Sequence, residues 1–86
     1  MPVPPDARLS ELGTAVARRR RSLGLRQKEV ADLAGCSERF VYSLERGKPS
    51  VQLAKVLDVL GVLGLGLEVV PGSGTIGAAG GRGDPA

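Results

Sequence analysis

The charged residues of this chain are concentrated in its middle. Residues 18–55 hold ten Lys or Arg side chains and four Asp or Glu, a local excess of +6 within a chain of net charge +3. Such a cluster on a small domain is typical of a protein that binds a polyanion, although scattered Arg residues on a soluble surface would give similar counts. The chain has no His and one Cys, Cys36. These counts exclude a His-based catalytic triad, a His-containing metal site and an internal disulfide, so we predict no enzyme, metal, cofactor or small-molecule substrate.

Two short helices joined by a tight turn are predicted for residues 27–47, in the middle of this basic region. Residues 27–34 have apolar side chains at helical spacing and are followed by Gly35, which suits a left-handed helix end. Ser37 is then a good N-cap for a second helix, which Gly47 ends. The predicted inner faces are Val30, Leu33 and Ala34 in the first helix, and Val41 and Leu44 in the second. This arrangement is the helix-turn-helix plan, whose second helix enters the major groove of DNA.

Two runs of residues carry a family resemblance. The pattern R-x-x-L-G-L-x-Q-x-E-V-A-x-x-A-G over residues 20–35, followed by C-S-E-R-F-V-Y-S-L-E-R-G-K-P, resembles the Xre-type, phage-repressor-like helix-turn-helix family. The RFV…LERGKP portion and the later LDVLG…LGLEVVP are similar to the HipB-like antitoxin branch of that family. The match spans roughly residues 9–71 and implies a mainly α, four-helix, lambda-repressor-like domain over residues 9–64.

An arginine falls on the apolar stripe of the helix predicted for residues 9–22. The stripe consists of Leu9, Leu12, Val16, Arg20 and Leu23. A guanidinium on such a face is costly to bury unless it is paired. The family resemblance implies that Arg20 pairs with Glu45, the residue that ends the recognition helix.

The sequence departs from the family pattern at the start of the helix predicted for residues 27–34, and it predicts one more helix after the motif. The family usually caps the first helix of the motif with Thr or Ser, whereas this chain has Arg26. We therefore expect a weaker cap, supported by Glu29 and by a hydrophobic staple between Leu25 and Val30. A fourth helix is predicted after residue 52 and ends at Gly61 or Gly64. Its predicted core stripe is Leu53, Val56, Leu57 and Leu60.

Residues 65–71 alternate as a β-strand does. Leu65, Leu67 and Val69 would share one face, and the chain contains no other predicted strand. Because a lone strand leaves its backbone groups unpaired, its partner must come from another molecule. Two copies pairing about a two-fold axis would form a two-stranded lid over both fourth helices, as the HipB-like resemblance also implies. The alternative is a flexible tail segment.

The two ends of the chain are predicted to be disordered. Residues 1–8 are Pro-rich, and residues 72–86 are Gly-rich with few apolar side chains. Residues 72–77 match G-x-G-x-x-G and residues 82–84 read Arg-Gly-Asp, but neither has the structural context that its function needs. Residues 1–5 have neither the charged nor the apolar region of a signal peptide, and the longest apolar stretch, residues 59–67, is too short to span a bilayer. We therefore expect a cytoplasmic protein with no membrane contact.

The second helix of the motif supplies the residues expected to read DNA. Side chains near its N-terminus reach base edges, whereas basic and polar groups around it grip phosphates. The candidates for base reading are Glu38, Arg39, Phe40 and Ser43. The candidates for phosphate contact are Arg26, Gln27, Ser37, Tyr42, Arg46 and Lys48. Phe40 could equally pack within the domain, and each of the others could be an ordinary solvated side chain.

The function that these residues favour is sequence-specific repression by a homodimer bound to a pseudo-palindromic operator in double-stranded DNA. The HipB-like resemblance implies the antitoxin of a toxin–antitoxin pair, which would autoregulate its operon and bind a HipA-like kinase toxin. One alternative is a stand-alone Xre-type transcriptional regulator. A second is a protein-interaction module that no longer binds DNA.

Overall fold

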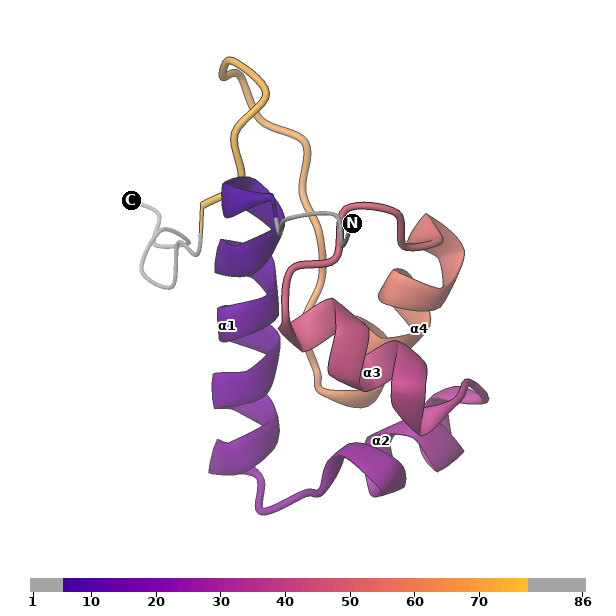
Figure 1. Ribbon diagram of the computed structural model, residues 1–86. Helices are drawn as coiled ribbons and strands as arrows, with labels where there is room; N and C mark the ends of the chain where they lie inside the picture. The colour runs from indigo at the N-terminus through magenta and orange to yellow at the C-terminus, as the bar shows by residue number, and fades with distance from the viewer. Residues whose placement is uncertain (1–5, 78–86) are drawn as a thin grey trace.

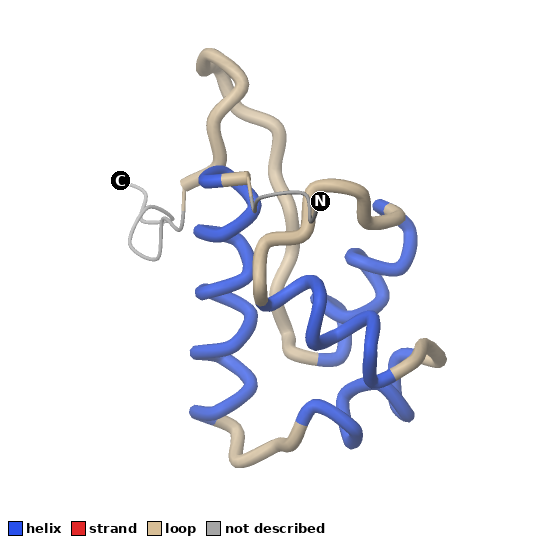
Figure 2. The backbone as a smooth tube through the Cα atoms, viewed as in Figure 1, coloured by secondary structure: helices blue, strands red, loops and turns tan. Residues whose placement is uncertain are grey.

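Four helices follow one another along the chain, and α1 stands to one side of the other three (Figure 1). They are α1 (Ala7–Ser22), α2 (Gln27–Ala34), α3 (Glu38–Glu45) and α4 (Leu53–Val62). The computed structural model describes residues 6–77 and, over this range, contains helices and loops without a strand (Figure 2). The prediction of a mainly helical, four-helix helix-turn-helix domain is confirmed.

All four helices contribute aliphatic side chains to one core. The chain has no Trp and one Phe, so the centre of the domain is built from Val, Leu and Ala. Burying each Val or Leu stabilises the fold by about 1.5–3 kcal/mol relative to leaving it exposed. The buried cluster consists of Val16, Val30, Ala31, Val41, Leu44, Val56, Val59, Leu60 and Leu63.

The predicted inner faces of two helices are wrong in part. In α2, Leu33 is 68% exposed and Ala31 is buried in its place. In α4, Leu53 and Leu57 are 62% and 45% exposed, whereas Val59 is buried, as is Leu63 directly after the helix. Because α4 is apolar on nearly every side, helical spacing permits more than one stripe, and packing against α2 decides which one faces the core.

The first helix begins at Ala7, two residues before the predicted start at Leu9. Asp6 is the reason, because its Oδ1 accepts the backbone N–H of Arg8 at 2.8 Å and so caps the helix. The backbone N–H of Asp6 also donates to the carbonyl of Gly47 at 3.1 Å, which ties the start of α1 to the turn after α3. Leu23, predicted on the apolar stripe, lies beyond the end of α1 and is exposed.

A glycine lets α1 cross the end of α3 at very short range. A Cβ atom at Gly13 would overlap the backbone carbonyl oxygens of Leu44 and Glu45. Gly13 is buried inside a helix, where glycine costs about 1 kcal/mol relative to alanine, so close backbone approach accounts for its presence. The contact fixes the last turn of α3 against the middle of α1.

Residues 65–71, predicted as a strand, form an extended loop. A strand needs a paired neighbour, and within residues 6–77 the chain offers none. Residues 1–5 and 78–86, which contain most of the predicted N-terminal segment, the end of the predicted Gly-rich tail and the Arg-Gly-Asp sequence, lie outside the described residues.

Replacing Asp6 by Asn should flatten the acid dependence of stability. Hydrogen bonds from the side chain and backbone of Arg8 lower the pKa of the Asp6 carboxyl from 3.8 to about 2. A lowered native pKa contributes stability that is present above about pH 4 and is lost as the pH falls toward about 2. Because Asn also caps helices, thermal melts between those pH values should show a smaller loss of stability for Asp6→Asn than for wild type. Parallel curves for the two proteins would contradict this.

Candidate nucleic-acid interface

The turn between α2 and α3 is built by local backbone geometry. Gly35 has φ of 73°, in the left-handed region, and the N–H of Cys36 donates to the carbonyl of Ala31 at 3.0 Å. The Ser37 hydroxyl then accepts the N–H of Phe40 at 3.0 Å and caps α3. Burial raises the pKa of the Cys36 thiol, which packs against the core as a small apolar side chain. The turn and its caps set the direction in which α3 leaves α2.

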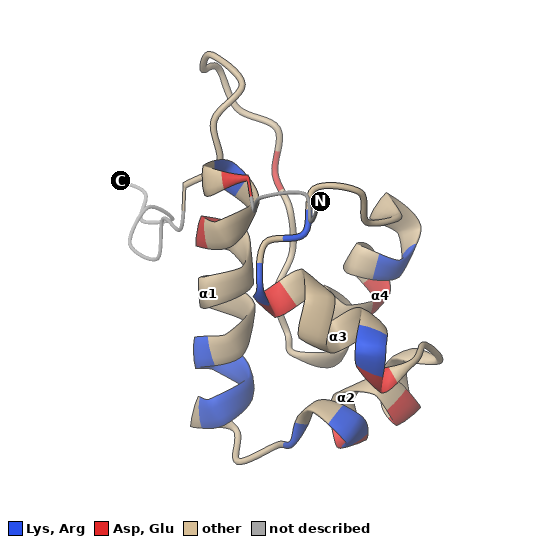
Figure 3. Cartoon of the chain, in the orientation of Figure 1, with Lys and Arg blue, Asp and Glu red and all other residues tan. Residues whose placement is uncertain are grey.

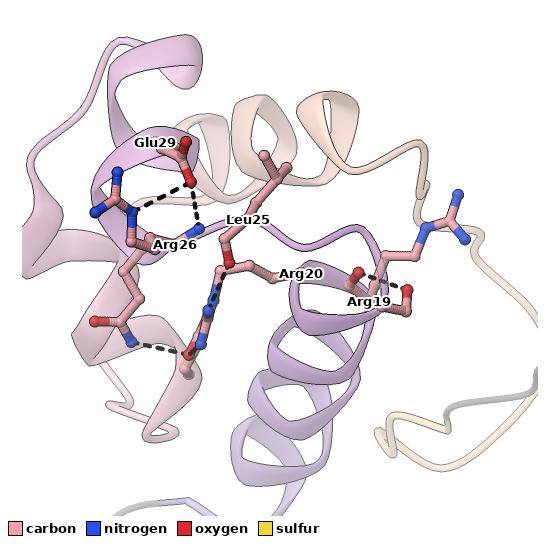
Figure 4. Close-up of polar contacts among 8 residues, drawn as sticks. Arg19, Arg20, Leu25, Arg26 and Glu29 are labelled. Carbon is pink, nitrogen blue, oxygen red and sulfur yellow. Dashed lines mark hydrogen bonds and ion pairs between the residues drawn. The ribbon is translucent and has the colours of Figure 1, made fainter.

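The start of α2 has half of a capping box, as the sequence indicates. The Glu29 carboxylate accepts the backbone N–H of Arg26 at 2.8 Å, which lowers the pKa of Glu29 (Figure 4). The Arg26 side chain cannot complete the capping box, because a guanidinium has no hydrogen-bond acceptor for a backbone N–H of α2. It lies over Glu29 instead, with Nε and Oε1 3.5 Å apart, and is otherwise open to solvent. Arg26 therefore presents its charge at the N-terminal end of α2.

A buried ion pair joins α1 to the end of α3. Arg20 Nε lies 2.6 Å from Oε2 of Glu45, and Arg20 Nη2 donates to Oε1 of the same carboxylate at 3.0 Å. The side chains are 11% and 6% exposed, and hydrogen bonding to Glu45 raises the pKa of the Arg20 guanidinium. A third donor, Nη1, bonds the carbonyl of Leu25 at 2.9 Å (Figure 4). One guanidinium thus holds α1, the α1–α2 loop and α3 together.

Gln27 belongs to the same network, a contact that the sequence reading did not anticipate. Its side-chain Nε2 donates to Oε1 of Glu45 at 2.9 Å, so the first residue of α2 is tied to the last residue of α3. One of the two amide hydrogens is therefore engaged within the domain, and the second remains available to an outside acceptor. The signal available in the sequence was Glu45 itself, since a carboxylate has about four acceptor sites and a bidentate arginine fills two of them.

The outer face of α3 is polar. Val41 and Leu44 face the core, while Glu38, Arg39 and Tyr42 are exposed and Ser43 is half-buried. The following residue, Arg46, places its guanidinium carbon 5.5 Å from the centroid of the Tyr42 ring. The exposed face therefore has one free arginine near the helix N-terminus and a second cation stacked near its end.

Phe40 lies apart from the other base-reading candidates. It is half-buried and packs against the core cluster, and Nζ of Lys55 on α4 lies 5.9 Å from its ring centroid. A side chain that packs between α3 and α4 does not lie on the exposed face of α3 that carries Arg39. The structure thus favours the alternative that Phe40 packs within the domain.

The remaining phosphate candidates lie around α3. Arg26 precedes α2, Ser37 precedes α3 and Lys48 follows it, and all three are exposed. Figure 3 shows further cations on the C-terminal half of α1 beside the start of α2. Over residues 6–77 there is no group of His, Cys, Asp or Glu that could hold a metal ion. Within the same range no helix has the length and apolar character that crossing a membrane requires.

This geometry defines a helix-turn-helix domain of the kind that binds DNA: two helices at a fixed angle, with a polar second helix exposed along its length. The profile of the helix-turn-helix domain family matches residues 11–71. The chain belongs to this family, in its Xre-type group, whose members are transcriptional regulators and not enzymes.

Similar proteins agree with this assignment. The chain is 42% identical over 61 residues to an uncharacterized HTH-type transcriptional regulator, y4mF, of Sinorhizobium fredii, covering 71% of this chain and 80% of that protein. It is 30% identical to the restriction-modification controller protein C.AhdI of Aeromonas hydrophila, with a TM-score of 0.63, covering 69% and 86% of the two chains. A chain of the HipA-HipB-O2-O3 complex has the same fold, with a TM-score of 0.69 at 20% identity over 76% and 92%.

Removing the arginine of the buried pair should destabilise the domain strongly. We expect Arg20→Ala to cost about 3 kcal/mol of unfolding free energy, because Glu45 is left buried with only Gln27 as a side-chain partner. Arg21→Ala is the matched control, since Arg21 is its exposed neighbour in the same helix. Urea denaturation measures both. An Arg20→Ala protein as stable as Arg21→Ala would mean that the pair contributes nothing.

Proposed function

We propose that this protein is a sequence-specific transcriptional repressor that binds a pseudo-palindromic operator as a homodimer. The observation that carries the proposal is the exposed polar face of α3, with Arg39 free of any partner among residues 6–77. Helix-turn-helix proteins insert this face into the major groove, where an arginine can bind O6 and N7 of guanine in bidentate fashion. Because its DNA lies there, we expect the protein to act in the cytoplasm.

The residues divide into those that read bases and those that hold the backbone. Arg39, Glu38 and Ser43 are our base-reading set, and Glu38 can accept a hydrogen bond from N4 of cytosine. Positioning on the phosphates falls to residues around α3 and at the start of α2. This second set is Arg26, Gln27, Ser37, Tyr42, Arg46 and Lys48. Through its bond to Glu45, Gln27 would couple its phosphate contact to the position of α3.

Exposed apolar side chains support the homodimer. Leu53 and Leu57 lie on the outer side of α4, and Leu67 and Val69 lie on the extended segment that follows. Leaving four large aliphatic side chains in water is unfavourable, and a second copy would cover them. A paired strand from residues 65–71 of each copy, lying over both α4 helices, accounts for this exposure.

We further propose the antitoxin role, with a HipA-like kinase toxin as partner. Its support is the similarity of the LERGKP and LGLEVVP segments to HipB-like sequences, together with the shared fold. The test is the reading frame beside the gene: a kinase-like product that co-elutes with this chain in gel filtration supports the role. If no such product binds, the protein is a stand-alone regulator, the alternative favoured by its 30% identity to a controller protein.

Substitutions on and beside α3 should separate base reading from phosphate binding. On a duplex selected from a random-sequence pool, Arg39→Ala should lose about 1–3 kcal/mol of binding free energy and bind a scrambled duplex almost unchanged. Lys48→Ala should weaken both duplexes alike and reduce the salt slope by about one. Fluorescence anisotropy over a salt series measures both variants. If Arg39→Ala weakened every duplex equally, Arg39 would be a phosphate contact.

Shortening the chain should reveal the dimer contact. A chain ending after Leu65 keeps the end of α4, whose last turn is closed by the bond from the Leu65 N–H to Leu60, but loses the exposed segment. We expect it to sediment as a monomer and to bind half-sites weakly. A chain ending after Pro71 is the matched control and should remain a dimer. If the shorter chain stayed a dimer at micromolar concentration, the helices alone would hold the two copies together.

A further inference from the structure

The segment after α4 is held at both of its ends by arginines of α1. Arg19 Nε donates to the carbonyl of Leu63 at 2.8 Å, and Arg8 Nη1 donates to the carbonyl of Gly74 at 3.1 Å. These residues lie at opposite ends of α1, so the chain between them is drawn along the helix (Figure 1). Gly64, with φ of 72°, turns the chain out of α4 at the start of this path.

Between these two contacts the backbone of residues 66–70 is unpaired. No hydrogen bond joins it to any other residue in the range 6–77. Leu67 is 48% exposed and Val69 is fully exposed. An extended backbone with free N–H and C=O groups and exposed apolar side chains is a template for strand pairing.

We propose that residues 65–69 pair antiparallel with the same residues of a second copy, in the register that places Leu67 opposite Leu67. This inference rests on the homodimer proposed above and specifies its contact. The occupant is a second copy because the segment is complementary to itself in this register, in backbone, in side-chain size and in charge.

The backbone determines which residues can bond across the pair. In an antiparallel ladder, residues alternate between pairs that exchange two N–H···O bonds and pairs that exchange none. The N–H of Leu65 already donates to the carbonyl of Leu60 at 2.8 Å, so Leu65 belongs to a pair that exchanges none. Because the two kinds of pair alternate, the pair of Leu67 with Leu67 also exchanges no backbone hydrogen bond. The pair between them, Gly66 with Glu68 of the second copy, exchanges two N–H···O bonds.

Side chains favour the same register. Leu65 faces Val69 of the second copy, and the two Leu67 side chains meet on the same face, which gives three apolar cross-strand pairs. Two Glu68 carboxylates placed directly opposite each other would repel, and in this register each Glu68 lies opposite Gly66 instead. A Cβ at Gly66 would meet nothing within 4 Å among the described residues, so no contact within residues 6–77 explains a glycine there, whereas the Glu68 side chain opposite it needs space.

Neighbouring registers are worse for physical reasons. A shift of the two-fold axis to Glu68 places the two carboxylates directly opposite each other. A shift to Gly66 places Val69 opposite Leu63, which is buried at the end of α4. Pairing an odd residue with an even one would turn the apolar face of one strand against the polar face of the other.

Disulfide trapping tests the register in the full chain. In a Cys36→Ser background, Leu67→Cys should form a disulfide-linked dimer, because Cα atoms in a non-bonded pair lie about 4.5 Å apart, within disulfide reach. Val69→Cys is the matched control: the Cα atoms of its two copies would lie about 14 Å apart, so the copies should crosslink at least about tenfold less. Mixing Val69→Cys with Leu65→Cys should restore the crosslink, because these two positions face each other.

The outcomes separate this register from the dimer itself. Sedimentation of the reduced Cys36→Ser protein reports whether a dimer exists, independently of any crosslink. A dimer in which Leu67→Cys fails to crosslink, or crosslinks no better than Val69→Cys, overturns the register and leaves the proposed function standing. A reduced protein that is monomeric at about 100 μM, where a specific dimer of micromolar affinity would form, overturns both the register and the homodimer.

Discussion

The buried contact between Arg20 and Glu45 is the constraint on which the rest of the domain depends. It supplies a charge-assisted bidentate pair between α1 and the end of α3. The third guanidinium nitrogen donates to the Leu25 carbonyl, and Oε1 of Glu45 also accepts from Gln27. Replacing such a pair by apolar residues of similar volume is often neutral or stabilising, so stability alone does not explain its presence. The geometry of the pair explains its presence, because four segments meet at one guanidinium and one carboxylate. These segments are α1, the α1–α2 loop, α2 and α3, and each is positioned by its bonds to the pair.

The position of α3 follows from two contacts at its C-terminal end. Gly13 brings α1 against the last carbonyls of α3, and the Arg20–Glu45 pair fixes the same turn through a side chain. The N-terminal end of α3 is set by the Ser37 cap and the Gly35 turn. Between these ends the exposed face is positioned without using any of its own side chains, which leaves Arg39 available for a ligand.

Local signals in the sequence were sufficient for the helix-turn-helix unit and insufficient for the faces of α2 and α4. Caps and turns depend on a few adjacent residues, so Ser37 and Gly35 were predictable from their positions. Ala31 and Val59 were missed because several apolar residues compete for the inner face of a short helix, and only packing among helices selects between them. The bond from Gln27 to Glu45 was missed for the same reason, since it joins residues that become neighbours only after α2 packs on α3.

The measurement that tests this account most directly is the DNA affinity of Arg20→Met combined with Glu45→Leu, in a protein that urea denaturation shows to be as stable as wild type. If the pair orients α2 and α3, the double variant should bind the selected duplex more weakly, by at most about tenfold. Gln27 is then no longer held by a hydrogen bond to a charged partner, worth about 1.5 kcal/mol, and has to be ordered when the DNA binds. Affinity equal to that of wild type would contradict the account, since the pair would then serve stability alone.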